Sequence, residues 1–155
     1  MKRLEINYSL NGIDALVSLS RYNFVNRTNP DKSLKVLDFG CGSGYGTKLL
    51  KEHFKNVDAY DSYPDDYFPE NFNLITKIED LENDYDIITN FEVIEHLEKE
   101  NQLGLLELIS SKLKKNGLLY ISTVRKITPP PTKNREIEHK YELSYEELYN
   151  LCSKI

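Results

Sequence analysis

Short apolar runs alternate with segments of helical periodicity along most of this chain. Each run is nearly continuous in aliphatic and aromatic residues, which is typical of strands buried on both faces of a parallel sheet. Five strands are predicted from these runs, at residues 34–39, 57–61, 72–76, 86–89 and 118–123.

Between the runs, apolar residues recur at the spacing of one helix face. Helices are predicted at about residues 8–26, 46–55, 103–113 and 144–151. Lys115-Asn116-Gly117 closes the third of these, and Ser144 and Glu147 have the spacing of a capping box at the start of the fourth. Residues 62–71 carry two prolines and are predicted to form a loop. The alternation predicts an α/β fold with an open, mainly parallel sheet flanked by helices.

The length of 155 residues suits one domain with a core of its own. That domain is predicted to cover residues 1–155, with a helical segment at 1–30 and a segment after strand five at 125–155. Apolar residues make up 39% and charged residues 29%, as in soluble globular proteins. Neither a membrane span nor the apolar block of a signal peptide stands out, so no membrane partner is expected.

Charge and cysteine content narrow the choice of partners and compartment. The formal net charge of −5 argues against a general attraction to nucleic acid, although a local basic patch is compatible with it. Cys41 lies inside a glycine cluster and Cys152 near the C-terminus, a placement that does not suggest a disulfide. A cytoplasmic location is therefore expected.

The glycine cluster follows the first predicted strand directly. Residues 36–46 read Val-Leu-Asp-Phe-Gly-Cys-Gly-Ser-Gly-Tyr-Gly, and a helical pattern comes next. A strand, a glycine turn and a helix N-terminus form a cradle that a nucleotide-like ligand can approach closely. The dinucleotide fingerprint fails in both registers, because Tyr45 or Thr47 stands at its third glycine. The phosphate loop of nucleotide hydrolases fails as well, since no Gly-Lys-Ser/Thr follows.

The pattern Asp38-x-Gly40-Cys41-Gly42-x-Gly44 resembles the first motif of the class I S-adenosylmethionine-dependent methyltransferases. The resemblance covers roughly residues 20–150 and implies a Rossmann-like methyltransferase sheet with S-adenosylmethionine as cofactor. It also implies that the glycine turn passes the amino-acid end of the cofactor and that Asp38 helps to hold that end.

Two further acids follow strands in this pattern. Asp61 ends the second predicted strand, where a carboxylate can accept hydrogen bonds from both hydroxyls of a ribose. The family resemblance places the ribose-binding acid at this position. By the same resemblance, Asp80, after strand three, is expected to contact the adenine, and Asn90, after strand four, is expected beside the cofactor.

The segment after strand four carries the candidate chemistry. If a helix begins at Glu92, then Glu92, Glu95 and His96 share one face at positions i, i+3 and i+4. Two carboxylates and an imidazole suit a divalent cation such as Mg²⁺, Mn²⁺ or Zn²⁺. They would lie at the carboxyl edge of the sheet, where open α/β folds bind their ligands.

This segment resembles the E-V-I-E-H segment of two branches of the family. One branch contains O-methyltransferases acting on quinone precursors and sugars, and the other methylates the 3′-terminal ribose of small RNAs through a bound metal. In the RNA branch a later histidine completes the metal site, and His139 is the candidate for it here. Without a metal, His96, His139 or Glu95 is expected to act as the base that takes the proton from a hydroxyl acceptor.

Three functions therefore stay open. The leading prediction is O-methylation of a sugar or other small molecule, and the second is a metal-dependent RNA 3′-terminal 2′-O-methyltransferase, against which the acidic charge counts. The third is a non-catalytic cofactor-binding subunit that a partner chain completes. It is motivated by the last two strands of the family sheet, for which the resemblance leaves no room in residues 1–155. The edge beside strand five is then expected to be covered by residues 125–143, by a second copy or by another chain.

Overall fold

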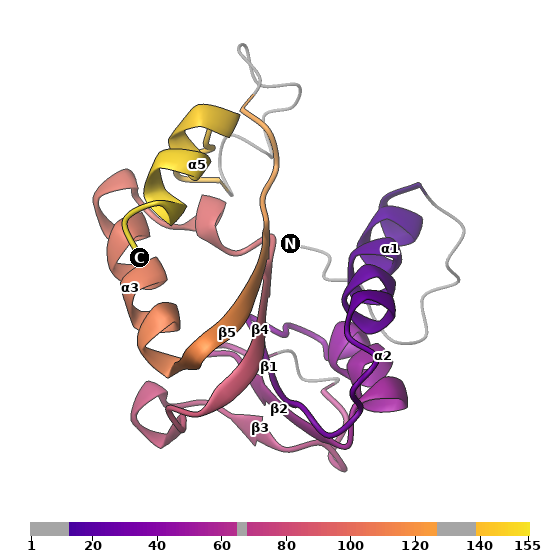
Figure 1. The fold of residues 1–155 in the computed structure, drawn as a ribbon. Coiled ribbons are helices and arrows are strands. Elements are labelled where there is room, and N and C mark those ends of the chain that lie inside the picture. The colour runs from indigo at the N-terminus through magenta and orange to yellow at the C-terminus, as the bar shows by residue number, and fades with distance from the viewer. Residues whose placement is uncertain (1–12, 65–67, 127–138) are drawn as a thin grey trace.

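The computed structural model describes residues 13–64, 68–126 and 139–155, and these form a five-stranded sheet between two layers of helices (Figure 1). The strand order is β3-β2-β1-β4-β5, and every pairing is parallel. The first strand is therefore central and lies between the second and the fourth, which confirms the predicted fold class and arrangement.

The strands are close to the predicted ones, except for the last. They are β1 (Lys35–Phe39), β2 (Asn56–Tyr60), β3 (Leu74–Ile75), β4 (Tyr85–Phe91) and β5 (Leu113–Ser122). The predicted helix through residue 113 is wrong at its end, because Leu113 already has extended backbone angles and opens β5. Residues 115–117, which were predicted to end this helix, instead lie within β5, where Asn116 has a φ of 67°. The strand register is irregular here, because Tyr85 of β4 pairs with Leu113 whereas Ile87 pairs with Leu118.

Helices cover both faces of the sheet. The helix α1 (Ile13–Thr28) and the helix α2 (Tyr45–His53) lie on one face, while α3 (Lys99–Lys112) and α5 (Tyr145–Cys152) lie on the other (Figure 1). Single 3₁₀ turns, η1 (Ile78–Asp80) and η2 (Ile94–His96), follow β3 and β4. The beginning of the helix predicted at residues 8–26 lies outside the described residues, and its end lies two residues further along. The helix predicted to reach residue 55 ends at His53.

Alternating side chains of the central strands fill both layers of core. Val36 and Ile87 pack with α1 and α2, and Leu37 and Ile88 pack with Ile109 of α3, because successive strand residues point to opposite faces. All five side chains are 1% exposed or less. A third cluster joins α3 and α5 to the end of β5, and its buried members are Ile94, Leu106 and Leu143.

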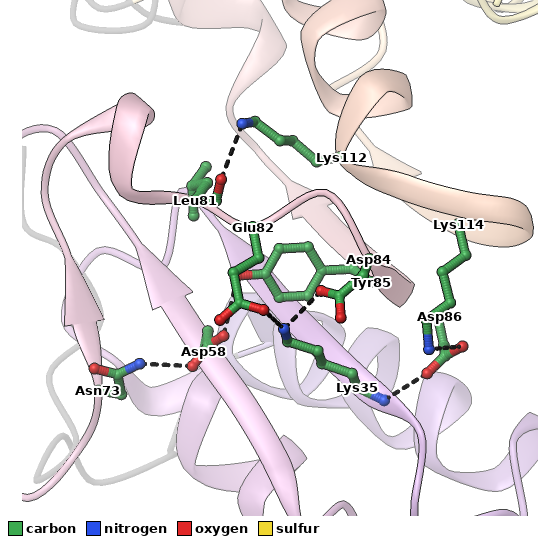
Figure 2. Close-up of polar contacts among 10 residues, drawn as sticks. All are labelled: Lys35, Asp58, Asn73, Leu81, Glu82, Asp84, Tyr85, Asp86, Lys112 and Lys114. Carbon is green, nitrogen blue, oxygen red and sulfur yellow. Dashed lines mark hydrogen bonds and ion pairs between the residues drawn. The ribbon is translucent and has the colours of Figure 1, made fainter.

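Charged side chains hold the amino ends of the strands in register (Figure 2). Lys35 of β1 pairs with Glu82 and with Asp84, 2.6 Å away, both just before β4. Asp86 of β4 accepts a hydrogen bond from the Lys35 backbone N–H (2.8 Å) and pairs with Lys114 of β5 (2.7 Å). This network lies at the sheet edge where the strands begin, and it leaves the opposite edge for ligands.

Among the described residues, none of the helices has both the length and the apolar content that crossing a membrane requires.

Candidate functional site

A cavity of about 730 Å³ opens beyond the carboxyl ends of β1, β2 and β4. Its size is that of a small-molecule or cofactor site, and its position is the usual one in open α/β sheets. Its walls consist of Ser18, Tyr22, Phe39, Gly40, Cys41, Gly42, Ser43, Tyr45, Tyr60, Asp61, Ser62, Tyr63, Ile78, Phe91, Glu92, Val93, His96, Leu97, Leu105 and Leu108.

The glycine loop forms the floor of this cavity. Its backbone is tied to the end of β2, because the N–H groups of Gly40 and Cys41 both donate to the Tyr60 carbonyl, at 2.7 and 3.1 Å. Gly40 has a φ of 84°, and a Cβ there would collide with the Val93 side chain. Gly44, the N-cap of α2, has a φ of 79°, and a Cβ there would lie 2.8 Å from the Phe68 ring. Both positions therefore require glycine.

Asp38 anchors this loop from below. Three hydroxyl groups donate to its carboxylate: those of Thr47 (2.7 Å), Thr89 (2.8 Å) and Tyr22 (3.2 Å), from α2, β4 and α1. The side chain is buried, and burial raises the pKa of Asp38 although these hydrogen bonds oppose the shift. Asp38 therefore joins four elements beneath the glycine loop and does not form part of the cavity wall.

Asp61 stands at the end of β2 and lines the cavity. Its Oδ2 accepts a hydrogen bond from the Gly42 N–H (2.9 Å), and its Oδ1 accepts one from the Tyr63 N–H (2.8 Å). A carboxylate has about four lone-pair sites, so two remain for a ligand. The backbone contacts thus orient Asp61 toward the cavity and leave acceptor capacity free.

The two ends of the cavity are apolar and belong to different layers of the core. At one end, Ile78, Leu105 and Leu108 pack against Phe39 and Tyr60 on the α3 face. The described wall residues between this end and the other are mostly small or polar.

At the other end, three aromatic rings line the cavity on the α1 face. The Tyr22 ring meets the Tyr45 ring at 5.6 Å and the Phe91 ring at 5.0 Å, both edge to face. Beside them, Arg21 pairs with Glu92 at 3.1 Å. None of the described wall residues is a lysine or an arginine, and the ion pair with the wall residue Glu92 places the Arg21 guanidinium next to this aromatic end.

The helix predicted to begin at Glu92 is wrong. Glu92 has a left-handed φ of 57°, and only the single turn η2, at Ile94–His96, follows. Its carboxylate therefore points to Arg21 and to the Ser122 hydroxyl (3.1 Å), away from the group that the predicted helix face would have formed. A non-glycine residue in this backbone region is strained, which is common where a wall residue must be aimed.

The structure does bring Glu95, His96 and His139 together. One ligand atom from each lies within 4.8 Å of the others, and the two imidazole rings meet at 5.1 Å, nearly perpendicular. His96 lines the cavity, while Glu95 and His139 lie behind it. The group therefore forms part of one wall, with His96 at the surface of the cavity.

Glu95 is a fully buried carboxyl group with one satisfied oxygen. Oε2 accepts a hydrogen bond from the Thr123 hydroxyl (2.9 Å), and Oε1 has no hydrogen-bond partner in the described part of the chain. Burial raises the pKa of Glu95, and the nearby charge of Glu92 raises it further. An unpaired buried acceptor is costly, so this oxygen favours a proton or a cation.

The predicted site residues divide into two groups. Those that line the cavity are Gly40, Cys41, Gly42, Asp61, Glu92 and His96. Those that the structure describes outside its walls are Asp38, Gly44, Asp80, Asn90, Glu95 and His139. Asp80 is exposed in η1, where Ile78 faces the cavity instead, and the buried Asn90 amide donates to the Phe39 carbonyl at 3.1 Å. Their roles toward a ligand remain predictions.

Sequence reasoning did not assign the aromatic end or Arg21 to the site. Tyr22 and Arg21 belong to α1, and nothing in the spacing of that helix marks a face that reaches a cavity formed by the sheet. The apolar wall from α3 was likewise indistinguishable from core residues. Only a contact between distant segments identifies these side chains as part of the site.

Comparisons with known proteins agree with this geometry. A family model described as a methyltransferase domain matches residues 16–153. A ubiquinone biosynthesis O-methyltransferase of Rickettsia typhi is 36% identical over 110 residues, which are 63% of this chain and 44% of that protein. A probable S-adenosylmethionine-dependent methyltransferase of Mycobacterium tuberculosis is 31% identical over 127 residues, 75% of this chain and 46% of that protein. The chain spans about half the length of the relatives it matches.

Solved structures share the fold. A SAM-dependent methyltransferase from Archaeoglobus fulgidus superposes with a TM-score of 0.67 at 24% identity, covering 88% of this chain and 67% of that one. The 1,6-didemethyltoxoflavin-N1-methyltransferase of Burkholderia thailandensis, solved with bound 1,6-didemethyltoxoflavin and S-adenosylhomocysteine, gives a TM-score of 0.65 at 18% identity, covering 96% of this chain and 80% of that one. At these identities the likeness concerns the fold alone.

Proposed function

Since the chain belongs to the methyltransferase-domain family, we propose that its cavity binds S-adenosylmethionine and that the domain transfers the methyl group to a hydroxyl of a small molecule. The observation that carries this proposal is the cavity at the carboxyl edge of the sheet, with the glycine loop as its floor and Asp61 oriented into it. Relatives named as O-methyltransferases support oxygen as the accepting atom. A sugar or a phenol would serve as such an acceptor.

The cavity suits each part of this cofactor. The apolar end at Ile78, Leu105 and Leu108 fits the adenine, and Asp61 fits the ribose hydroxyls. The cofactor's carboxylate would then lie toward Arg21, the cation beside the opposite end. Its volume of about 730 Å³ leaves room for a small acceptor as well.

The chain's own residues would position the acceptor and take its proton. A bound sulfonium methyl is already electrophilic, so alignment and exclusion of water supply much of the rate. The rings of Tyr22, Tyr45 and Phe91 provide an apolar wall for the acceptor, and the imidazole of His96 lines the same cavity. His96 would accept the hydroxyl proton, with Glu95 and His139 behind it.

Calorimetry with S-adenosylhomocysteine tests the cofactor site. The chain should bind it, and Asp61→Asn should weaken binding by roughly 1.5–3 kcal/mol, or about 10- to 150-fold in Kd, because the negative charge and one of the two acceptor oxygens are lost. Glu79→Gln removes an exposed carboxylate from η1 and is the matched control. Absence of binding at about 1 mM ligand would contradict the proposal.

A metal-dependent mechanism is the second candidate, favoured by the grouping of Glu95, His96 and His139. The donor set fits a divalent cation, because it supplies a buried carboxylate oxygen without a partner and two imidazoles. Glu92 would not belong to this set, since it pairs with Arg21. A bound cation would acidify the acceptor hydroxyl, and a small RNA 3′ end is the alternative acceptor under this mechanism.

Chelation separates the two mechanisms. Methyl transfer to a catechol, a hexose and an RNA 3′ end is measured with and without a chelator, and then with Mg²⁺ or Mn²⁺ restored. A metal mechanism predicts loss and recovery of activity, whereas an acid–base mechanism predicts no change. In either case His96→Ala should lower the rate roughly 10²- to 10⁴-fold. Full turnover by that variant would remove His96 from the chemistry.

A further inference from the structure

The histidine behind the cavity comes from a segment distant in sequence, and that segment is held in place at several points. The backbone N–H groups of Lys140 and Tyr141 both donate to the Glu95 carbonyl, at 2.9 and 3.2 Å. Leu143 is 2% exposed and packs with Ile94 in the third core cluster. Residues 139–143 are therefore docked onto the η2 turn that carries His96.

Gln102 of α3 joins the same two segments from inside. Its amide is fully buried and lies within hydrogen-bonding distance of three carbonyls: Tyr141 (2.8 Å), Ile94 (3.0 Å) and Leu97 (3.3 Å). One donor group thus holds both ends of η2 and the 139–143 segment. A buried side chain bonded in this way fixes the relative position of His96 and His139.

Glu142 acts on His139 directly. Its carboxylate lies 2.7 Å from His139 Nδ1, and both side chains are mostly buried, with exposed fractions of 12% and 14%. A carboxylate can only accept, so the neutral imidazole must carry its proton on Nδ1 and leave Nε2 as the lone-pair nitrogen. The hydrogen bond also sets the plane of the ring that packs edge-on against His96.

We propose that Glu142 is a positioning residue for the cavity: it holds His139 in the Nδ1–H tautomer and orients that ring against His96. The inference rests on the proposed function, because it concerns the wall at which the acceptor would lose its proton. It holds for either mechanism, since both a base and a metal ligand need a defined lone-pair nitrogen.

Long-range ¹H–¹⁵N correlation of the intact, ¹⁵N-labelled chain tests this. Spectra are recorded at about pH 9, where a histidine of ordinary pKa, about 6.5, is neutral. The chain has three histidines, so His53→Gln and His96→Gln assign the signals. We expect Nδ1–H for His139 in the wild type, whereas a free neutral imidazole prefers the proton on Nε2. Glu142→Ala should return His139 to that preference.

Glu142→Gln should preserve the Nδ1–H tautomer, because its carbonyl oxygen can accept the same hydrogen bond. Glu146→Gln, an exposed acid nearby, is the control and should change nothing. Calorimetry should give the Glu142 and Glu146 variants the wild-type Kd for S-adenosylhomocysteine within about twofold, since both residues are outside the cavity wall. On adding this ligand, the His96 signals should shift differently in Glu142→Ala than in the wild type.

An Nε2–H tautomer in the wild type would overturn the inference, as would an unchanged tautomer in Glu142→Ala. The wild-type spectrum decides the point even if the alanine variant fails to fold. If the wild type does not bind S-adenosylhomocysteine, the proposed function fails instead, whatever the tautomer. The two failures are therefore distinguishable.

Discussion

At the scale of single residues, the charged groups around the cavity either stabilise the fold or remain able to bind a ligand. Asp38 supports the fold, because hydroxyl groups from three other elements donate hydrogen bonds to its buried carboxylate. Asp61 is held by backbone N–H groups and keeps acceptor capacity toward the cavity. Arg21 and Glu92 satisfy one another at the aromatic end, and a ligand carboxylate can take the place of Glu92 there.

Arg21 is expected to recognise the carboxylate of the cofactor. Arg21→Ala should weaken binding of S-adenosylhomocysteine about 10- to 100-fold, the scale of a lost charged hydrogen-bond pair. Binding of 5′-methylthioadenosine, which lacks the amino-acid end, should change less than about twofold. Calorimetry with both ligands measures the difference.

Arg27→Ala is the control for this experiment, because Arg27 is an exposed arginine in the last turn of the same helix. If Arg21→Ala weakens binding of both ligands equally, the arginine supports the fold of α1 and does not bind the cofactor's carboxylate.

At the scale of elements, the start of α5 is fixed by a complete capping box. Ser144 Oγ accepts from the Glu147 N–H (3.2 Å), and Glu147 accepts from the Ser144 N–H (2.8 Å). The Tyr141 hydroxyl also donates to Glu147, at 2.6 Å. The Ser144 N–H and this hydroxyl lower the pKa of Glu147 to about 2. The cap thus ties α5 to the segment that carries His139.

Glu147 should make the stability of the domain depend on pH in the acid range. Its pKa is lower in the folded chain, so its contribution is present above the ordinary value of 4.5 and is lost as pH falls toward 2. The free energy of unfolding of Glu147→Gln should therefore differ most from the wild type at neutral pH, and the difference should shrink below about pH 4.5. Urea titrations at a series of pH values measure it.

Ser144→Ala removes the other half of the box and serves as a comparison. It should cost about 1 kcal/mol of unfolding free energy. A difference for Glu147→Gln that stays constant between neutral and acid pH would show that the carboxylate charge plays no part in the cap.

At the scale of the whole molecule, the two edges of the sheet differ. The short β3 forms one edge, and β5, which pairs with β4 alone in the part of the chain that the structure describes, forms the other. Leu118 of β5 is 48% exposed. Residues 127–138, part of the segment predicted to cover this edge, lie outside the described residues. An open strand edge is a template for pairing with another chain.

We expect the chain to self-associate through β5. Leu118→Lys should lower the mass measured by sedimentation equilibrium to that of one chain, because a charge on an edge strand opposes pairing. Leu16→Lys, at an exposed apolar position of α1, is the matched control and should leave association unchanged. A wild type that stays monomeric at high concentration would contradict this prediction. The β5 edge would then be expected to be covered by another protein or by residues 125–143 of the same chain.

Much of the fold and part of the site followed from the sequence alone. The parallel sheet with a central first strand, the glycine loop and the position of Asp61 were all predicted. These features depend on hydrophobic period, on the turn chemistry of glycine and on the rule that parallel strands end at one edge. Each is local, or follows from topology once the elements are assigned.

The tertiary structure determined the orientation, the burial and the hydrogen-bond partners of the side chains at that edge. Glu92 is turned by a left-handed backbone angle toward Arg21, and Asp38 is enclosed by hydroxyls of other elements. His139 reaches His96 only because Gln102 and the Glu95 carbonyl dock its segment onto η2. Burial and orientation of this kind arise from contacts between residues far apart in the chain, and no periodicity within one segment encodes them.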